Sequence, residues 1–240
     1  MPLNPFVYEA CLEKGIRFPD IPVLAPECYG QCGEDLIVQA LLEATALRLG
    51  VDLKKTACVE VGGNHPFATS ATYLLSKRFG LTSVVVEANE QLLEALRKGR
   101  PNDVIVYGAV QDKDVDHVMF STSRLSELSS LDRSFVLKWD KGRVGEASWT
   151  EVPALRINDV LRKHVKSRTI SYLSIDVEGM DLAILKDMDF GAWRPWFVQA
   201  EPSEAQVRGN TQEIIALLGT VGYRLIARTS VNLIFGDQRT

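Results

Sequence analysis

The sequence predicts an α/β fold with a mostly parallel central sheet, helices on both faces and an antiparallel hairpin at the C-terminal end. Short β-branched runs alternate with helical segments, as expected when helices connect parallel strands. The first run ends in a glycine pair, and three of the later runs end in acidic residues. The 240 residues suffice for one full domain and are short for two.

The chain is predicted to begin with an arm and a helix. Residues 1–27 are rich in proline and aperiodic, which indicates an irregular arm ahead of a domain over residues 28–240. Residues 34–49 carry apolar side chains at helical spacing, which predicts an amphipathic helix. Strands and helices then alternate. Strands are predicted at residues 56–61, 83–87 and 103–110, and helices at residues 70–79 and 91–98.

The alternation loosens over residues 111–153 and then returns. This stretch is rich in serine and charge, and we interpret it as an insertion over one end of the sheet, with short strands at residues 117–121 and 148–152. Beyond it, helices are predicted at residues 157–165, 180–185 and 211–221, and strands at residues 171–176 and 197–201. Residues 224–228 and 231–235 form the closing hairpin around Thr229 and Ser230.

The composition is that of a globular protein with a small negative charge. Hydrophobic residues make up 46% of the chain, and the formal net charge is −4 with an isoelectric point of about 5.5. This charge argues against a nucleic-acid partner. The N-terminal residues do not resemble a secretory leader, and no run of about 18 uncharged apolar residues occurs. We therefore expect a cytoplasmic protein without a membrane span; a homo-oligomer is compatible with these features.

The four cysteines lie in the first quarter of the chain, at Cys11, Cys28, Cys32 and Cys58. Cys28 and Cys32 have the spacing of half a zinc site, but the three histidines are scattered and supply no second pair. Reduced structural thiols are the better interpretation.

Glycines and acidic residues mark the carboxyl ends of the predicted strands, where ligands bind in sheets of this kind. Gly62 and Gly63 follow the first strand, and Glu87 ends the second. A carboxylate at that position accepts hydrogen bonds from both ribose hydroxyls of an adenosine. Together the glycine turn and the acidic strand end predict a nucleoside cofactor.

The residues after the glycine pair indicate which nucleoside. A dinucleotide fingerprint needs a G-x-G-x-x-G run, whereas residues 64–67 are Asn-His-Pro-Phe. S-adenosylmethionine has no phosphate and carries an ammonium and a sulfonium group, for which the carboxylates of Glu60 and Asp176 are favourable. The sequence therefore favours S-adenosylmethionine.

At these residues the chain resembles the FkbM-type family of class I S-adenosylmethionine-dependent methyltransferases, which act mainly on hydroxyls of sugars and natural products. The matching stretches are YGQCGEDLIV (29–38), VEVGGNHPFATSATYLL (59–75), VVVEANEQLLEAL (84–96), SIDVEGMDLAILKDMDF (174–190) and VQAEP (198–202). Glu60 and Gly63 replace the family's usual Asp and Ala, and Ala71 stands where relatives tend to have Asn. The resemblance implies a Rossmann-like class I methyltransferase fold and O-methylation of a sugar, glycan or natural product.

The resemblance also implies roles for single residues. Gly62 and Asn64 hold the methionyl part, Glu87 the ribose and residues 109–111 the adenine. Gln31, Glu34 and Asp35 either cap the first helix or, as the family pattern implies, belong to a lid over the cofactor. The full set expected to contact the cofactor is Gln31, Glu60, Gly62, Gly63, Asn64, Glu87, Ala88, Ala109, Val110 and Asp176. Asp176 and Glu178 lie where the methyl group and the acceptor meet, so Asp176 is the first candidate for a base or an orienting group.

Two alternative interpretations of the chemistry stay open. His65 has an ordinary pKa near 6.5, which suits proton abstraction near neutral pH, although it also fits a residue that orders the turn. Asp176, Glu178 and Glu201 are alternatively the ligands of a Mg²⁺ ion that binds a diol.

The insertion offers candidates for acceptor binding. Its basic residues either grip an anionic acceptor or form a solvated loop, and its tryptophans either stack on a sugar ring or pack internally. These residues are Arg124, Arg133, Lys138, Lys141, Arg143, Trp139 and Trp149.

Three rival functions share the predicted fold. An NAD(P)-dependent oxidoreductase shares the acidic ribose contact, and a non-catalytic adapter would keep the fold as a scaffold. A protein or nucleic-acid methyltransferase would use the same cofactor.

Overall fold

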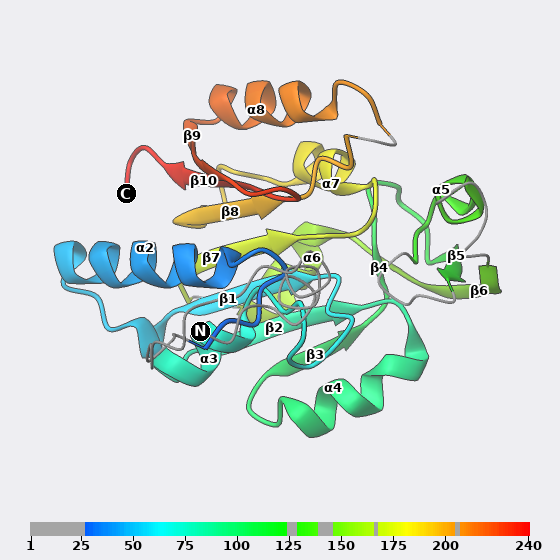
Figure 1. Ribbon diagram of the computed structural model, residues 1–240, viewed down its shortest axis with the longest axis horizontal. Helices are drawn as coiled ribbons and strands as arrows, with labels where there is room; N and C mark the ends of the chain where they lie inside the picture. Colours follow the sequence, from blue (N-terminus) through cyan, green and yellow to red (C-terminus); the bar gives the residue numbers. More distant parts are fainter. Residues whose placement is uncertain (1–26, 124–128, 139–145, 166–167, 205–206) are drawn as a thin grey trace, which may run out of the picture.

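A seven-stranded sheet forms the centre of the computed structural model (Figure 1), which describes residues 27–123, 129–138, 146–165, 168–204 and 207–240. Its strand order is β3 (Val104–Tyr107), β2 (Thr82–Glu87), β1 (Ala57–Val61), β7 (Ile170–Ile175), β8 (Phe197–Ala200), β10 (Leu233–Asp237) and β9 (Tyr223–Arg228). The first five strands are parallel, and β10 runs antiparallel to both of its neighbours. The predicted mostly parallel sheet with a closing hairpin is confirmed.

Helices cover both faces of this sheet, as predicted. On one face, α2 (Glu34–Leu49) and α3 (Tyr73–Phe79) pack through Val38, Leu42 and Leu75 into one apolar core. On the other, α6 (Ile157–Val160), α7 (Asp181–Asp187) and α8 (Asn210–Thr220) contribute to a second core. The remaining elements are η1 (Leu53–Lys55), η2 (Glu90–Leu92), α4 (Leu93–Gly99) and η5 (Leu161–Val165), a π-helical turn that continues α6.

The single strand predicted over residues 103–110 is wrong. These residues form two strands, β3 and β4 (Ala109–Val110), which belong to different sheets. β3 ends at Tyr107, and β4 pairs instead with β6 (Glu146–Leu155). Gly108 makes the change of direction at a φ of 144°, and a Cβ there would lie 2.7 Å from Leu155 Cδ1. Only glycine fits this close approach.

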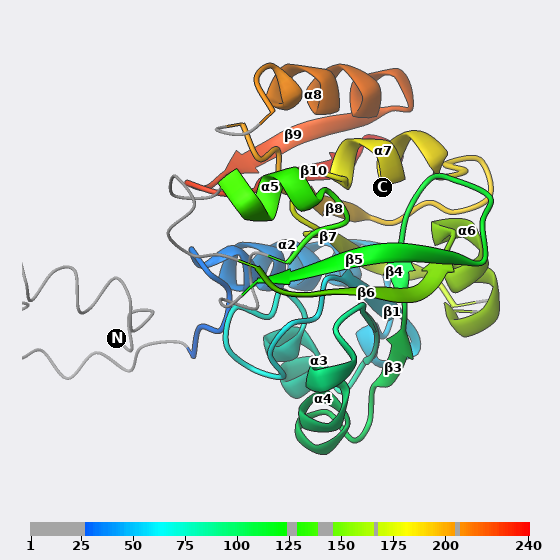
Figure 2. The same cartoon turned by 90° about the vertical axis from the view of Figure 1, so that its right-hand side faces the viewer.

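The insertion forms a second, three-stranded sheet. β5 (His117–Ser123) pairs antiparallel with β6, and α5 (Arg133–Lys138) lies against β5. In Figure 2 this sheet and α5 cross in front of the central sheet. The strands β5 and β6 and the helix α5 therefore lie over one end of the central sheet.

The predicted helix over residues 70–79 begins late, at Tyr73. Ser70 Oγ, the Ala71 backbone N–H and Thr72 Oγ1 instead donate hydrogen bonds to the carboxylate of Glu60. The Glu60 side chain therefore holds residues 70–72, ahead of α3, in a non-helical conformation. Polar groups of these three residues have their hydrogen-bond partner outside the helix.

Candidate functional site

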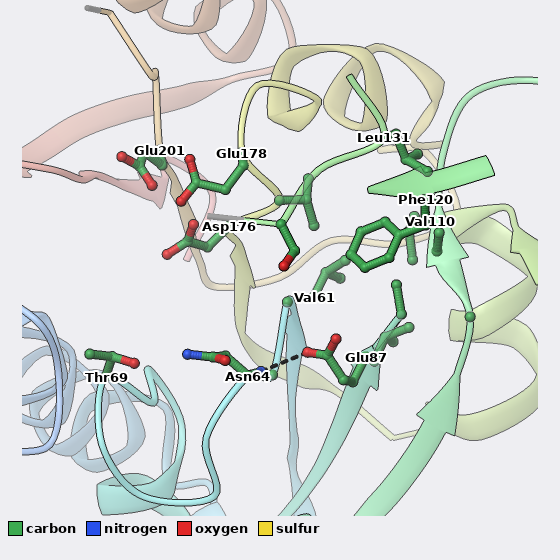
Figure 3. Close-up of a pocket in the computed structure, with 18 of the residues that line it drawn as sticks. Val61, Asn64, Thr69, Glu87, Val110, Phe120, Leu131, Asp176, Glu178 and Glu201 are labelled. Atoms are coloured by element: carbon green, nitrogen blue, oxygen red, sulfur yellow. Dashed lines mark hydrogen bonds between the residues drawn. The ribbon is translucent and has the colours of Figure 1, made fainter. Parts of the chain in front are cut away.

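A cavity of about 250 Å³ lies at the carboxyl ends of β1, β2, β7 and β8 (Figure 3). Most of the predicted site residues line it. These are Gln31, Gly62, Gly63, Asn64, Glu87, Ala88, Ala109, Val110, Asp176, Glu178 and Glu201. The remaining lining residues include Thr69, Phe120, Ser129, Leu131 and Val231, which the sequence did not indicate.

The glycine turn after β1 is tightly constrained. Gly62 has a φ of 93°, and a Cβ at this position would lie 1.9 Å from the Asp176 carbonyl oxygen. The backbone N–H groups of Gly62 and Gly63 both donate to the Val86 carbonyl oxygen, at 3.0 Å. The next one, of Asn64, donates to the carboxylate of Glu87 at 2.7 Å. The amides that would hold a pyrophosphate in a dinucleotide site are thus already bonded within the protein.

Glu87 is fixed at the edge of the cavity by the backbone. Its carboxylate accepts from the N–H groups of Asn64 and Asn89, at 2.7 and 2.6 Å. Burial raises the pKa of Glu87, and these backbone hydrogen bonds oppose that effect. Because each carboxylate oxygen has two lone-pair directions, Glu87 keeps acceptor capacity toward the cavity.

Backbone strain is concentrated around the cavity. Among the described residues other than glycine, Asn64, Thr69, Glu178 and Ser203 have positive φ values, between 40° and 60°. The first three line the cavity. Such conformations cost free energy and persist where the surrounding structure imposes them, so their clustering here makes this cavity the candidate functional site.

Three carboxylates meet at one end of the cavity, as Figure 3 shows. Oxygen atoms of Asp176, Glu178 and Glu201 all lie within 4.8 Å of one another. Burial, together with the negative charges of Asp176 and Glu178, raises the pKa of Glu201 to about 11. The cluster therefore retains a proton at neutral pH.

A fourth acid, Asp181, is bonded to the backbone beside this cluster and was missed by the sequence analysis. It is fully buried, and its carboxylate accepts from the backbone N–H groups of Glu201 at 2.9 Å and of Val177 at 3.4 Å. Burial and the neighbouring Asp176 raise the pKa of Asp181 well above its ordinary value. Asp181 thereby joins the loops that follow β7 and β8.

The opposite end of the cavity is apolar. Val110, Phe120 and Leu131 face it there (Figure 3), and the last two come from the insertion. The predicted adenine contacts Ala109 and Val110 lie in this region, whereas Gln111 turns away and its Oε1 accepts from the Lys113 backbone N–H. The insertion thus completes the cavity as well as covering the sheet.

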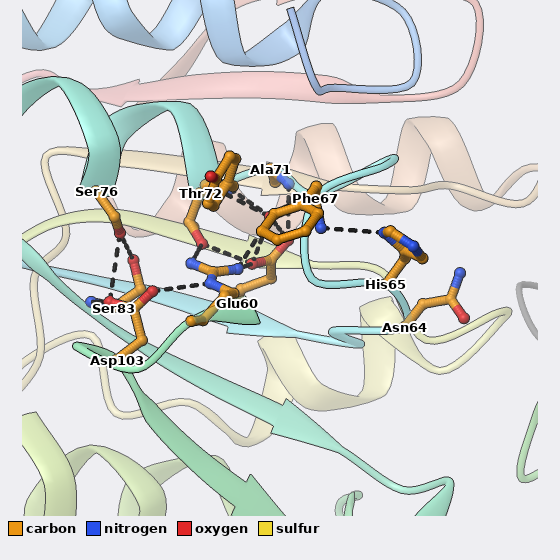
Figure 4. Close-up of polar contacts among 12 residues, drawn as sticks. Glu60, Asn64, His65, Phe67, Ala71, Thr72, Ser76, Ser83 and Asp103 are labelled. Carbon is orange, nitrogen blue, oxygen red and sulfur yellow. Dashed lines mark hydrogen bonds and ion pairs between the residues drawn. The ribbon is translucent and has the colours of Figure 1, made fainter. Parts of the chain in front are cut away.

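Glu60 is held by an ion pair and by hydrogen bonds within the protein. Its carboxylate forms an ion pair with Arg100 at 2.7 Å and accepts from Ser70 and Thr72 hydroxyls, with both charged side chains buried (Figure 4). Arg100 also pairs with Asp103 at 2.8 Å. Glu60 does not line the large cavity. These contacts hold the loop between β1 and α3, and Glu60 also lines a small polar hollow beside the cavity.

His65 lies on the exposed part of the same loop. Its Nδ1 accepts hydrogen bonds from the backbone N–H groups of Phe67 at 3.1 Å and Ala68 at 2.9 Å (Figure 4). Nδ1 is therefore engaged as an acceptor within the turn. His65 does not line the cavity, and its contacts support the alternative in which it orders the turn.

The basic and aromatic candidates of the insertion are only partly described. Arg124, Trp139, Lys141 and Arg143 lie outside the described residues, as does the side chain of Lys138. The Arg133 guanidinium lies over the Trp149 ring, 5.4 Å from its centroid. Neither of these two residues lines the cavity.

The described cysteines, Cys28, Cys32 and Cys58, are free thiols. Burial raises the pKa values of Cys28 and Cys58 to about 12, so both thiols stay protonated, and the Cys32 sulfur contacts the Ser230 hydroxyl at 2.9 Å. Cys11 lies outside the described residues.

Within the described part of the chain, the helices are too short or too polar to cross a membrane.

Comparisons with known proteins identify the family. The sequence profile of the methyltransferase FkbM domain matches residues 60–225, well over half of the chain, whereas no curated protein matches it significantly. The fold is similar to a TehB-like SAM-dependent methyltransferase from Corynebacterium glutamicum (11% identity, 98% of this chain and 100% of that chain, TM-score 0.41). It is also similar to an O-methyltransferase from Bacillus cereus in complex with SAH (12% identity, 89% and 92% coverage, TM-score 0.44). Both TM-scores are low, so the assignment rests on the profile match: the chain belongs to the FkbM family of S-adenosylmethionine-dependent methyltransferases.

Proposed function

We propose that this protein is an O-methyltransferase that acts on a hydroxyl of a sugar, glycan or natural product. The observation that carries the proposal is the polarity of the cavity, which is apolar at one end and has three carboxylates at the other. An adenosyl group fits the first end, and a hydroxyl that must lose a proton fits the second. S-adenosylmethionine supplies, when bound, a methyl group already activated by a sulfonium.

The residues around the cavity fit this cofactor. Glu87 would accept hydrogen bonds from the ribose hydroxyls, and Val110, Phe120 and Leu131 would enclose the adenine. The internally bonded amides of the glycine turn argue against a nicotinamide dinucleotide, since they leave no cradle for its pyrophosphate. Gly62 and Asn64, which line the cavity, would contact the methionyl part of the cofactor.

Asp176 is the residue we assign to the acceptor hydroxyl. It lines the cavity beside Glu178 and Glu201, and the cluster already holds one proton among its carboxylates. An ionised Asp176 would orient the hydroxyl and accept its proton as the oxygen is alkylated. The strained backbone of Glu178, with a φ of 53°, fixes the neighbouring carboxylate in the same place.

The negative charge of the cluster also bears on the class of acceptor. Three carboxylates repel phosphate groups, whereas neutral hydroxyls donate hydrogen bonds to them. This supports a sugar-like acceptor over nucleic acid. The same three residues would hold a Mg²⁺ ion through oxygen ligands, and such an ion would bind neighbouring hydroxyls of a diol. Activity measured with EDTA and with added Mg²⁺ separates these two modes of acceptor binding.

Two measurements test the proposed function. By isothermal titration, the protein should bind S-adenosylhomocysteine in the nanomolar to micromolar range and show no binding of NADH. With cofactor labelled in its methyl group, label should pass to the oxygen of a polyhydroxylated acceptor, identified by mass spectrometry. Binding of NADH alone would favour the oxidoreductase, and cofactor binding without methyl transfer to any acceptor class would favour the adapter.

A further inference from the structure

A small polar hollow adjoins the acidic side of the cavity. It shares Gln31, Gly62, Thr69 and Asp176 with the larger cavity, and Glu34 and Asn232 also line it. Its volume is about 10 Å³, which is room for one group the size of a water molecule. The hollow therefore lies beside the residues that we assign to the methionyl part of the cofactor.

Asn232 lines this hollow and carries an unsatisfied acceptor. The residue is 3% exposed, and its Oδ1 has no hydrogen-bond partner in the part of the chain that the structure describes. The amide is oriented by its Nδ2, which donates to Glu34 at 3.5 Å. A buried carbonyl oxygen without a donor costs free energy, so it indicates a missing donor in the hollow.

The charge of the hollow indicates what kind of donor is missing. Glu60 also lines it, but its charge is balanced by Arg100. Glu34 is 1% exposed, and among the described residues its hydrogen-bond donors are neutral, including the Cys32 N–H and the Thr229 hydroxyl. Within the described ranges, neither lysine nor arginine lines the hollow. A small cationic donor fits these surroundings better than a neutral one.

Two distant segments of the chain close this hollow together. Glu34 joins them, because its carboxylate bonds both the Cys32 N–H, beside Gln31, and the Thr229 hydroxyl of the β9–β10 turn. Cys32 and Ser230 make a second contact between the same segments. Recognition in the hollow would therefore depend on both segments lying over the cavity.

We propose that the polar hollow binds the α-ammonium group of the cofactor's methionyl part, with Asn232 Oδ1 and Glu34 as acceptors. An ammonium group has the size of a water molecule, carries three donors and brings a positive charge to the buried carboxylates. The inference rests on the proposed function, because it requires S-adenosylmethionine in the larger cavity. It makes Asn232 a determinant of selectivity for the intact amino-acid end of the cofactor.

The test compares the binding of two ligands to the wild type and to Asn232→Leu. Isothermal titration measures the Kd values of S-adenosylhomocysteine and of its analogue in which hydrogen replaces the α-amino group. The wild type should bind the analogue roughly tenfold to a hundredfold more weakly, as expected for a lost hydrogen bond to a charged group. In Asn232→Leu this ratio of Kd values should fall toward one. Asn210→Leu is the matched control, since Asn210 is equally buried but does not line the hollow, and it should keep the wild-type ratio.

Asn232→Asp provides a second test that does not depend on tolerance of leucine. The added carboxylate should raise the ratio of the two Kd values above that of the wild type. Equal binding of both ligands by the wild type would mean that the hollow holds only water, and a ratio unchanged by both Asn232 substitutions would equally overturn the proposal. Failure of the proposed function is distinguishable, since the wild type would then bind neither ligand.

Discussion

Two groups of acidic residues are treated differently by the fold. Glu60 and Asp103 share Arg100, so their charges are balanced and their oxygens are bonded. Asp176, Glu178 and Glu201 face one another, and Asp176, Glu178 and Asp181 all act on Glu201 with the same sign. The first group, which we call the scaffold group, holds the loop between β1 and α3. The second retains a proton and strained backbone, which is typical of a site that meets a ligand.

The largest effect on activity is expected from a substitution of Asp176, and this substitution tests the contrast between the two groups most directly. Asp176→Asn keeps the size of the side chain but removes its charge, so kcat should fall by roughly a hundredfold to ten-thousandfold, as for loss of a general base. The Kd of S-adenosylhomocysteine should change less than tenfold. Rates of labelled methyl transfer and titration of the product measure the two quantities. A variant with wild-type kcat would remove Asp176 from the chemistry.

The scaffold group should instead respond in stability. Arg100→Met leaves Glu60 and Asp103 buried without their cation, and we expect the free energy of unfolding to drop by about 3–5 kcal/mol. Denaturant titration followed by circular dichroism measures this. Arg162→Met is the matched control, because its pair with Asp159 is exposed and should contribute less than about 1 kcal/mol. Equal losses in the two variants would contradict the distinction.

The acidic cluster should destabilise the fold as pH rises. The pKa of Glu201 is raised to about 11 in the folded protein from an ordinary 4.5, so the unfolded chain releases this proton first. Stability linked to Glu201 is present below about pH 4.5 and is lost progressively toward pH 11. Glu201→Gln removes the linkage.

The Tm of Glu201→Gln, measured with EDTA, should therefore exceed that of the wild type at pH 8, and the difference should shrink toward pH 5. A difference that is constant over this range would show that the proton is not held at Glu201. Repeating the scans with Mg²⁺ tests the metal alternative, since a bound ion would stabilise the wild type selectively.

The smallest effect is expected at His65. Because its Nδ1 bonds two backbone N–H groups of an exposed turn, His65→Asn should lower kcat by less than about threefold, with the pH dependence of kcat unchanged. Activity profiles between pH 5.5 and pH 8.5 check this. Loss of an ionisation near pH 6.5 in the variant would restore His65 as the base.

The sequence by itself determined the local elements and their order. Residues 34–49 form the predicted helix to the residue, and the strand that ends at Glu87 lies where its β-branched run predicted it. The glycine turn and the acidic strand ends located the cavity as well. These features are set by periodicity and by backbone sterics, which act over a few residues.

Tertiary structure decided the direction and the partners of the charged side chains. Strand alternation places Glu60 on the opposite face from Val59 and Val61, yet only the folded chain brings Arg100 against it, 40 residues away. The same holds for Asn232 and Glu34, which come from opposite ends of the chain. The free energy of a buried charge depends on what surrounds it in space, and a linear pattern does not contain that information.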